Sequence, residues 1–263
     1  MEDLIKKLQQ CQAVSNKSFD PGNTTSEDFQ QPWNDAIDSL LKFGKGSDHS
    51  DSNSSGETQQ STQNDWIQRL WALHTEPTRH YHTAIHLQEM MEYLQVIRDC
   101  HVVDQQQLHY VCLVLAIYFH DAIYDPKSST NEEDSEKLWQ SCAKDLHLPN
   151  DIVTRVSHLI LETKHHKLPS SYDADPTLSL FLDLDLAVLA KEPDAYMAYA
   201  SMIRREYHFV PAETYCTKRA EILQSMLTSR LFGSPFFASC EERARRNLQQ
   251  EIESLKQGTI PSV

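Results

Sequence analysis

Four short segments of the sequence combine histidine with acidic residues in patterns that could hold a metal ion. They read Arg79-His-Tyr-His82-Thr-Ala-Ile-His86, Tyr118-Phe-His120-Asp121-Ala-Ile-Tyr-Asp125, Glu162-Thr-Lys-His165-His166 and Phe181-Leu-Asp183-Leu-Asp185. Imidazole nitrogens and carboxylate oxygens together suit divalent transition metals such as Zn, Mn, Fe and Co. The thirteen histidines are therefore more informative than the six cysteines, none of which forms a Cys-x-x-Cys pair.

His120 and Asp121 stand directly after the most apolar stretch of the chain, residues 111–119. A polar or charged side chain beside a hydrophobic core is costly to desolvate unless it has a partner. A divalent cation would satisfy both side chains, because it binds imidazole nitrogen and carboxylate oxygen together. The simpler alternative is a structural histidine at the C-terminus of a helix.

His82 and His86 share one face if a helix already includes residue 82, because they are four residues apart. Apolar residues follow at helical spacing at positions 87, 90, 91, 94 and 97, and this stripe directs His86 towards the interior. The alternative is a pair of surface histidines.

Asp185 lies in the middle of an apolar helical face, whereas Asp183 lies off that face. The face comprises Leu178, Phe181, Leu182, Asp185 and Leu189. An ionised carboxylate in such a place requires compensation on the order of several kcal/mol. Two explanations are open: a bound metal ion, or an ion pair with Arg204 or Arg219.

The order His, His-Asp, Asp, with each part on its own helix, resembles the HD-domain superfamily of metal-dependent phosphohydrolases. The resemblance covers residues 79–185 by motif. Flanking text, such as Asn-Glu-Glu-Asp-Ser and Ile-Arg-Arg-Glu-Tyr, is similar to a branch of predicted HD phosphohydrolases as far as about residue 255. The resemblance implies one divalent metal ion (Mn, Co, Fe or Zn, with Mg also allowed) in a helical bundle. The ligands it implies are His86, His120, Asp121 and Asp185.

Two further roles follow from likeness to relatives of this superfamily. The string Tyr81-His82-x3-His86 is similar to the first metal motif of cyclic-nucleotide phosphodiesterases, in which the earlier histidine protonates the leaving oxygen. His82 is therefore the predicted proton donor, and a near-neutral pKa suits it. Asp125 falls where stringent-response nucleotide hydrolases carry a catalytic acid. Its alternative is a turn residue before Pro126.

His165 and His166 fall where two-metal HD proteins have extra histidine ligands, but the Gly-Tyr-Pro signature of one such group is missing. A second metal is therefore not expected; one histidine should line the pocket and the other face solvent. Arg79 and Arg204, and with less support Arg219, are candidates for gripping phosphate oxygens, since a guanidinium can do so bidentately. Each could equally form a structural ion pair.

The predicted reaction is hydrolysis of a phosphate ester or anhydride by a metal-activated water, with Asp121 or Asp125 accepting the proton of the water. The resemblance implies a nucleotide or another small phosphorylated metabolite as substrate. Two alternatives remain open. One is a non-catalytic module that binds metal or nucleotide and acts through partners. The other, which His165 or His166 keeps open, is an HD-type di-iron oxygenase.

The composition limits the partners. The chain has 263 residues and a formal net charge of −14 without basic clusters, which argues against nucleic acid or an anionic membrane as the main partner. No apolar run approaches the roughly 18 residues of a membrane span, and the N-terminus has no secretory apolar region. Cysteines inside apolar helical patterns indicate reduced thiols, so we expect a cytoplasmic protein. A homo-oligomer is allowed.

Helical spacing runs through the chain from residue 65 onwards, and the six glycines are too few to suggest many turns. The sequence therefore predicts an all-α domain of eight or more helices over residues 65–263. A helix over 33–43 is expected to dock on it. Residues 1–32 are expected to be a loosely ordered leader. Residues 44–64 lack apolar side chains entirely, which predicts a disordered polar insertion.

Overall fold

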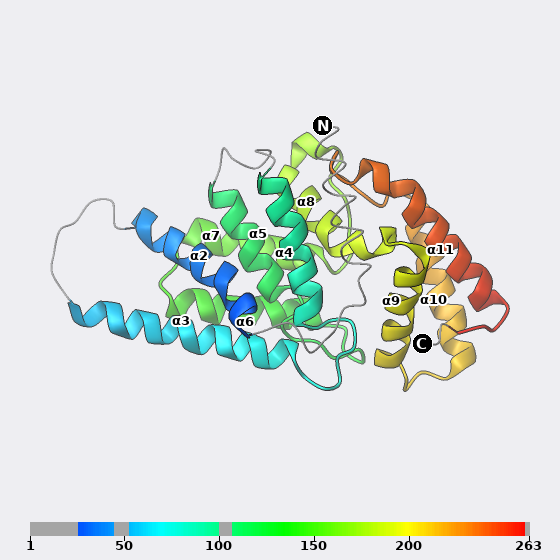
Figure 1. The fold of residues 1–263 in the computed structure, drawn as a ribbon, viewed down its shortest axis with the longest axis horizontal. Coiled ribbons are helices and arrows are strands. Elements are labelled where there is room, and N and C mark those ends of the chain that lie inside the picture. The colour runs from blue at the N-terminus through cyan, green and yellow to red at the C-terminus, as the bar shows by residue number, and fades with distance from the viewer. Residues whose placement is uncertain (1–25, 45–52, 100–106, 261–263) are drawn as a thin grey trace.

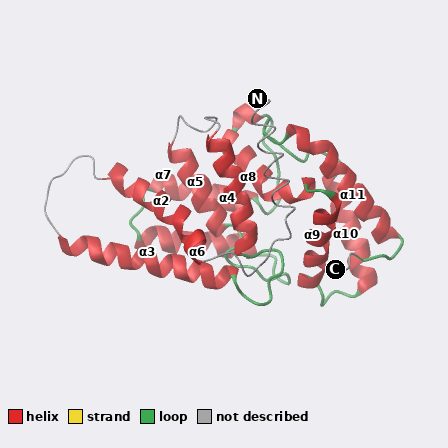
Figure 2. Ribbon diagram, in the orientation of Figure 1, coloured by secondary structure: helices red, strands yellow, loops and turns green. Residues whose placement is uncertain are grey.

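A computed structural model describes residues 26–44, 53–99 and 107–260, and within these ranges the chain forms ten α-helices and no strand (Figure 1, Figure 2). The helices are α2 (Ser26–Gly44), α3 (Asn53–His74), α4 (Ala84–Asp99), α5 (Gln107–Phe119), α6 (Asn131–Asp145), α7 (Asn150–Glu162), α8 (Pro176–Leu186), α9 (Pro193–Glu206), α10 (Ala212–Met226) and α11 (Glu241–Lys256). The prediction of an all-α fold with eight or more helices is confirmed.

Helix α5 forms the centre of the fold. Every residue from Val111 to Phe119 is buried, and the helix packs against α2, α4, α6, α7 and α8. Because neighbours cover all of its sides, apolar residues occur all round it instead of on one stripe. His120 and Asp121 follow its last residue, so the end of α5 delivers them to the interior.

Helix α2 begins at Ser26, seven residues before the start expected at residue 33. The later start was expected because the helical spacing of apolar residues begins at Trp33. The helix continues through Pro32 because Phe29 and Trp33, one turn apart, are both buried; each ring packs edge-on against Tyr118 of α5. Residues 1–25 of the expected leader lie outside the described part of the chain.

Helix α3 begins at Asn53, so residues 53–64 of the expected disordered insertion are helical. Trp66, Ile67 and Leu70 are buried and anchor the C-terminal half of the helix. Once such a segment is formed, each further residue gains a hydrogen bond at little cost, so a polar stretch can extend it. Gln63 is also buried. Residues 45–52 of the same prediction lie outside the described residues.

Helix α8 carries Asp185 into the core. Asp175 caps its first turn by accepting a hydrogen bond from the Leu178 amide (2.9 Å), and Pro176 occupies the first helical position, where its fixed φ suits a helix start. Residues 177–184 are all buried, and the helix contacts both α4 and α5. Asp185 is therefore held near the ends of the elements that carry the predicted histidine ligands.

Helices α9, α10 and α11 form the second part of the fold, on the right in Figure 1. Helix α11 packs along α10 and against the short 3-10 helix η2 (Ala187–Ala190), which follows α8 directly. Within the described residues, no helix combines the length and apolar composition that a membrane span requires.

Candidate metal centre

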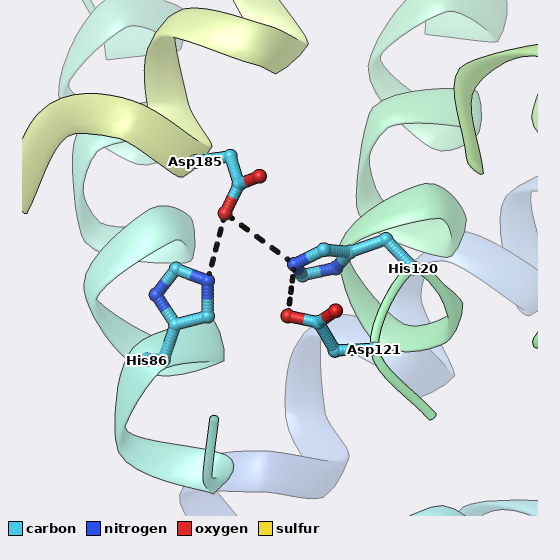
Figure 3. Close-up of side chains that lie close together, drawn as sticks. All are labelled: His86, His120, Asp121 and Asp185. Carbon is cyan, nitrogen blue, oxygen red and sulfur yellow. Dashed lines mark hydrogen bonds and ion pairs between the residues drawn. The ribbon is translucent and has the colours of Figure 1, made fainter. Parts of the chain in front are cut away.

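Four side chains from three parts of the chain converge in the interior (Figure 3). His86 comes from the first turn of α4, His120 and Asp121 follow α5, and Asp185 comes from the last turn of α8. One ligand atom of each lies within 4.8 Å of those of the other three. Across the residues that the structure describes, this is the one group of its kind.

The ring of His120 is oriented for metal binding. Its Nδ1 lies 3.0 Å from the Ile117 carbonyl oxygen, which can only accept, so we assign the ring proton to Nδ1. Its buried Nε2 lies 3.0 Å from Asp121 Oδ2 and 3.6 Å from Asp185 Oδ1, but makes no hydrogen bond. A lone pair held between two carboxylates requires a cation or a proton. The site therefore fits a metal ion.

His86 has a comparable arrangement. Its Nδ1 lies 3.1 Å from the Tyr81 hydroxyl, and its Nε2 lies 3.0 Å from Asp185 Oδ1. If Nδ1 donates to the hydroxyl oxygen of Tyr81, Nε2 is left for a metal, as outer partners commonly arrange in metal sites. Tyr81 is a partner of the candidate ligand His86 to which the sequence analysis gave no role.

The histidines and carboxylates of the centre shift one another's pKa values. Burial raises the pKa of both Asp121 and Asp185, but contacts with histidines outweigh it and hold both pKa values well below their usual range. Burial lowers the pKa of His120, but the two carboxylates outweigh it and hold that pKa well above its usual value. Without a metal, a proton on His120 compensates the acids. A divalent cation would replace that proton.

The two adjacent histidines after α7 separate, as the sequence analysis expects. His166 Nε2 lies 2.7 Å from Asp185 Oδ2, whereas His165 is exposed. The backbone of His166 has a φ of 45°, in the left-handed region that residues with a side chain seldom adopt. This conformation places the ring of His166 on the second oxygen of Asp185.

His82 lies beside the centre but not on α4, which begins only at Ala84. The assumption of one shared helical face is therefore wrong, although the rings of His82 and His86 are 6.3 Å apart. The His82 ring stacks on Tyr124 with centroids 4.2 Å apart, and its Nδ1 lies 2.7 Å from Glu206 Oε2. Burial lowers the pKa of His82, but Asp121 and Glu206 outweigh it and raise this pKa above its usual value.

Asp125 does not join the metal group. It is exposed, and its Oδ1 accepts a hydrogen bond from the Lys127 amide at 2.9 Å, which is an Asx turn around Pro126. The predicted catalytic role of Asp125 is therefore replaced by the alternative of a turn residue. The turn satisfies its carboxylate locally.

Arg79 and Arg204 do not present free guanidinium groups for phosphate, contrary to expectation. Arg79 is buried and donates to the carbonyl oxygens of His82, Asp121 and Ala122 at 3.2, 2.6 and 2.8 Å. Arg204 donates to the carbonyls that end α9 and the following turn, and its guanidinium lies 4.6 Å from the centre of the Tyr215 ring. Both guanidinium groups are occupied because helix ends and turns leave backbone carbonyl groups without partners. Arg79 thereby fixes the backbone of the metal centre.

Arg219 takes the ion-pair alternative, with Glu251 as its partner at 2.9 Å. Neither Arg219 nor Arg204 pairs with Asp185, whose partners are His86, His120 and His166. An ion pair with Arg204 or Arg219 therefore does not explain the buried position of Asp185.

Glu206 and Asp183 are among the buried acids that the sequence analysis did not predict to be buried. Glu206 lies on the same helical stripe of α9 as Tyr199 and Ile203, so the reasoning that identified Asp185 would also have identified it. Asp183 is fully buried and accepts hydrogen bonds from the amides of Gly233 and Ser234 at 2.6 and 2.7 Å. It lies off the apolar face, but α8 is buried on that side as well. No local signal marks it.

Ionisation of Glu206 should stabilise the fold at neutral pH and cease to do so in acid. Burial raises the pKa of Glu206, but hydrogen bonds from His82 and backbone amides outweigh it and lower the pKa from 4.5 to about 2. Because the folded value is the lower one, the contribution is complete above pH 4.5 and is lost as the pH falls towards 2. In urea unfolding, the difference in unfolding free energy between the wild type and Glu206→Gln should shrink over this interval. A difference independent of pH would contradict the prediction.

Comparison with protein-family models, curated proteins and solved structures finds no match for this chain. The function proposed below therefore rests on the chemistry of the residues in the centre and on the order of their motifs along the sequence.

Proposed function

We propose that this protein is a metal-dependent phosphohydrolase of the HD type. The observation that carries the proposal is the convergence of two imidazoles and two carboxylates within 4.8 Å in the interior. This donor set suits Mn, Fe, Co or Zn. The resemblance of the His, His-Asp, Asp order to HD phosphohydrolases supports the same reaction class. We propose a nucleotide or another small phosphorylated metabolite as substrate.

The residues of the centre would have different roles in the reaction. His86, His120, Asp121 and Asp185 would hold one divalent cation. When bound, the cation lowers the pKa of a coordinated water and polarises a phosphoryl oxygen. His82 would donate a proton to the departing oxygen, and the carboxylates of Asp121 and Glu206, which raise its pKa, favour the protonated ring. Asp121, rather than Asp125 in its exposed turn, would accept a proton from the attacking water.

Recognition of the phosphate would rely on few side chains. Because Arg79 and Arg204 donate to backbone carbonyls, the cation and His82 would balance most of the phosphate charge. His166, which is partly exposed beside Asp185, is the remaining candidate for contact with the substrate. We also propose a cytoplasmic location, since Cys112, Cys142 and Cys216 are buried free thiols.

The test is elemental analysis followed by a substrate screen. Purified protein should hold about one divalent metal ion per chain. Loaded with Mn or Co, it should release product from a generic phosphodiester or from a member of a nucleotide and sugar-phosphate library. Metal binding without any hydrolysis would favour the alternative of a non-catalytic binding module. Two iron ions per chain would instead favour an oxygenase.

A further inference from the structure

The carboxylate of Glu206 receives five hydrogen bonds and its side chain is completely buried. Its Oε1 accepts from the amides of His80, Tyr81 and His82 at 2.7, 2.7 and 3.1 Å. Its Oε2 lies 2.7 Å from Nδ1 of His82 and accepts from the hydroxyl of Tyr124 at 2.8 Å. One side chain of α9 thus holds both the backbone before α4 and the ring of His82.

We propose that Glu206 is a positioning residue that fixes His82 in the tautomer with its proton on Nδ1. Nε2 is then the nitrogen that exchanges a proton with the substrate. The assignment of that exchange rests on the proposed function, whereas the tautomer does not. A carboxylate can only accept, so the nitrogen facing Oε2 must carry hydrogen. Nε2, on the opposite edge of the ring, has no hydrogen-bond partner among the described residues.

Oε1 of Glu206 faces the three amides and Oε2 faces the ring of His82, so position 206 requires a side chain with two acceptor oxygens. Three amide N–H groups at Oε1 can be satisfied only by an acceptor, so a glutamine at position 206 must place its amide oxygen there. Its NH₂ group then faces Nδ1 of His82, and two donors cannot face each other. The neutral ring must therefore move its proton to Nε2. Glu206→Gln, although nearly isosteric, should reverse the tautomer.

This reversal would disable proton donation. In the wild type, doubly protonated His82 loses the hydrogen on Nε2 as the N–H bond breaks and an O–H bond forms on the departing oxygen. The neutral ring that remains keeps its hydrogen on Nδ1, bonded to Glu206. In Glu206→Gln the neutral ring carries its single hydrogen on Nε2, and its release would leave an anionic ring. The reaction therefore loses its proton donor.

The tautomer can be measured by ¹⁵N NMR on metal-free, full-length protein labelled at histidine, because protonated and unprotonated ring nitrogens resonate far apart. His82→Gln assigns the signals among the thirteen histidines. At a pH above the measured pKa of His82, we expect hydrogen on Nδ1 in the wild type and on Nε2 in Glu206→Gln. Tyr124→Phe is the matched control: it removes one donor from Oε2, keeps the carboxylate and should retain the wild-type tautomer.

If the neutral ring of His82 in the wild type carries its hydrogen on Nε2, that result alone would overturn the proposal. Retention of hydrogen on Nδ1 in Glu206→Gln would overturn it equally. If a substrate is found, kcat of Glu206→Gln should fall by about 10²–10⁴-fold with little change in KM. The expected tautomers in a protein that hydrolyses no phosphate compound would refute the proposed function and leave the positioning role of Glu206 intact.

Discussion

Replacing His120 and Asp121 together by alanine should abolish both metal binding and phosphohydrolase activity. The double variant removes two of the four donor atoms that lie within 4.8 Å of one another. Loss of an outer partner alone commonly costs about 10–100-fold in metal affinity, so loss of two direct ligands should exceed about 100-fold. Elemental analysis after dialysis should find no retained metal, and phosphate release should fall to background.

A variant that folds but retains metal would refute the centre as we describe it, so folding must be checked separately by circular dichroism. Two exposed residues provide matched controls. Asp125→Asn alters a carboxylate four residues from Asp121 that belongs to a turn, and His165→Ala alters the exposed neighbour of His166. Both should retain metal at the wild-type level.

Replacing Glu251 by alanine should produce the largest loss of stability that we expect from a single charged residue. Glu251 on α11 is fully buried, accepts a hydrogen bond from Arg219 Nε at 2.9 Å and also receives the hydroxyl of Tyr196. Its removal leaves the Arg219 charge and the Tyr196 hydroxyl without their acceptor. Breaking a buried pair in this way costs about 3–5 kcal/mol. Thermal unfolding should show a fall in Tm of roughly 10 °C.

The cost should arise from the stranded partner and not from loss of the pair itself. Removing all three groups together, by Glu251→Leu, Arg219→Met and Tyr196→Phe, should recover most of the lost stability, because no buried charge then remains unpaired. Glu242→Ala breaks the exposed pair between Glu242 and Arg246 on the same helix and should cost at most about 1 kcal/mol. Equal losses for Glu242→Ala and Glu251→Ala would contradict this explanation.

The candidate ligands could be predicted because a charge inside an apolar pattern is a local signal and because the resemblance to HD phosphohydrolases pointed to the same residues. Asp185 interrupts an apolar helical face, and His120 with Asp121 ends the most apolar helix. Both departures from periodicity are visible within one or two helical turns. The same reasoning applied to α9 would have identified Glu206, so its omission was not forced by the sequence.

The errors at Arg79, Arg204 and α3 share a cause. The residue type shows that a guanidinium group can bind phosphate. It does not show whether backbone carbonyl oxygens already accept the hydrogen bonds of that group in the folded chain. The carbonyl of Asp121 that Arg79 binds lies 42 residues further along the chain. The polar start of α3 lacks apolar periodicity, and its helicity depends on anchoring residues further along the helix. Tertiary contacts decide such cases.

The sequence by itself determined that the chain is helical, and its resemblance to HD phosphohydrolases implied which four side chains form the candidate metal centre. Hydrophobic periodicity and the free energy of burying a charge both depend on neighbouring residues, so both can be recognised in a short stretch of sequence. The tertiary structure alone decided which atom of each side chain faces the centre and that Arg79, Arg204 and Arg219 are engaged with other groups. Those choices depend on hydrogen bonds such as that from the His80 amide to Glu206, which spans 126 residues. No local pattern encodes a partner so distant, because only folding of the whole chain brings the donor and the acceptor together.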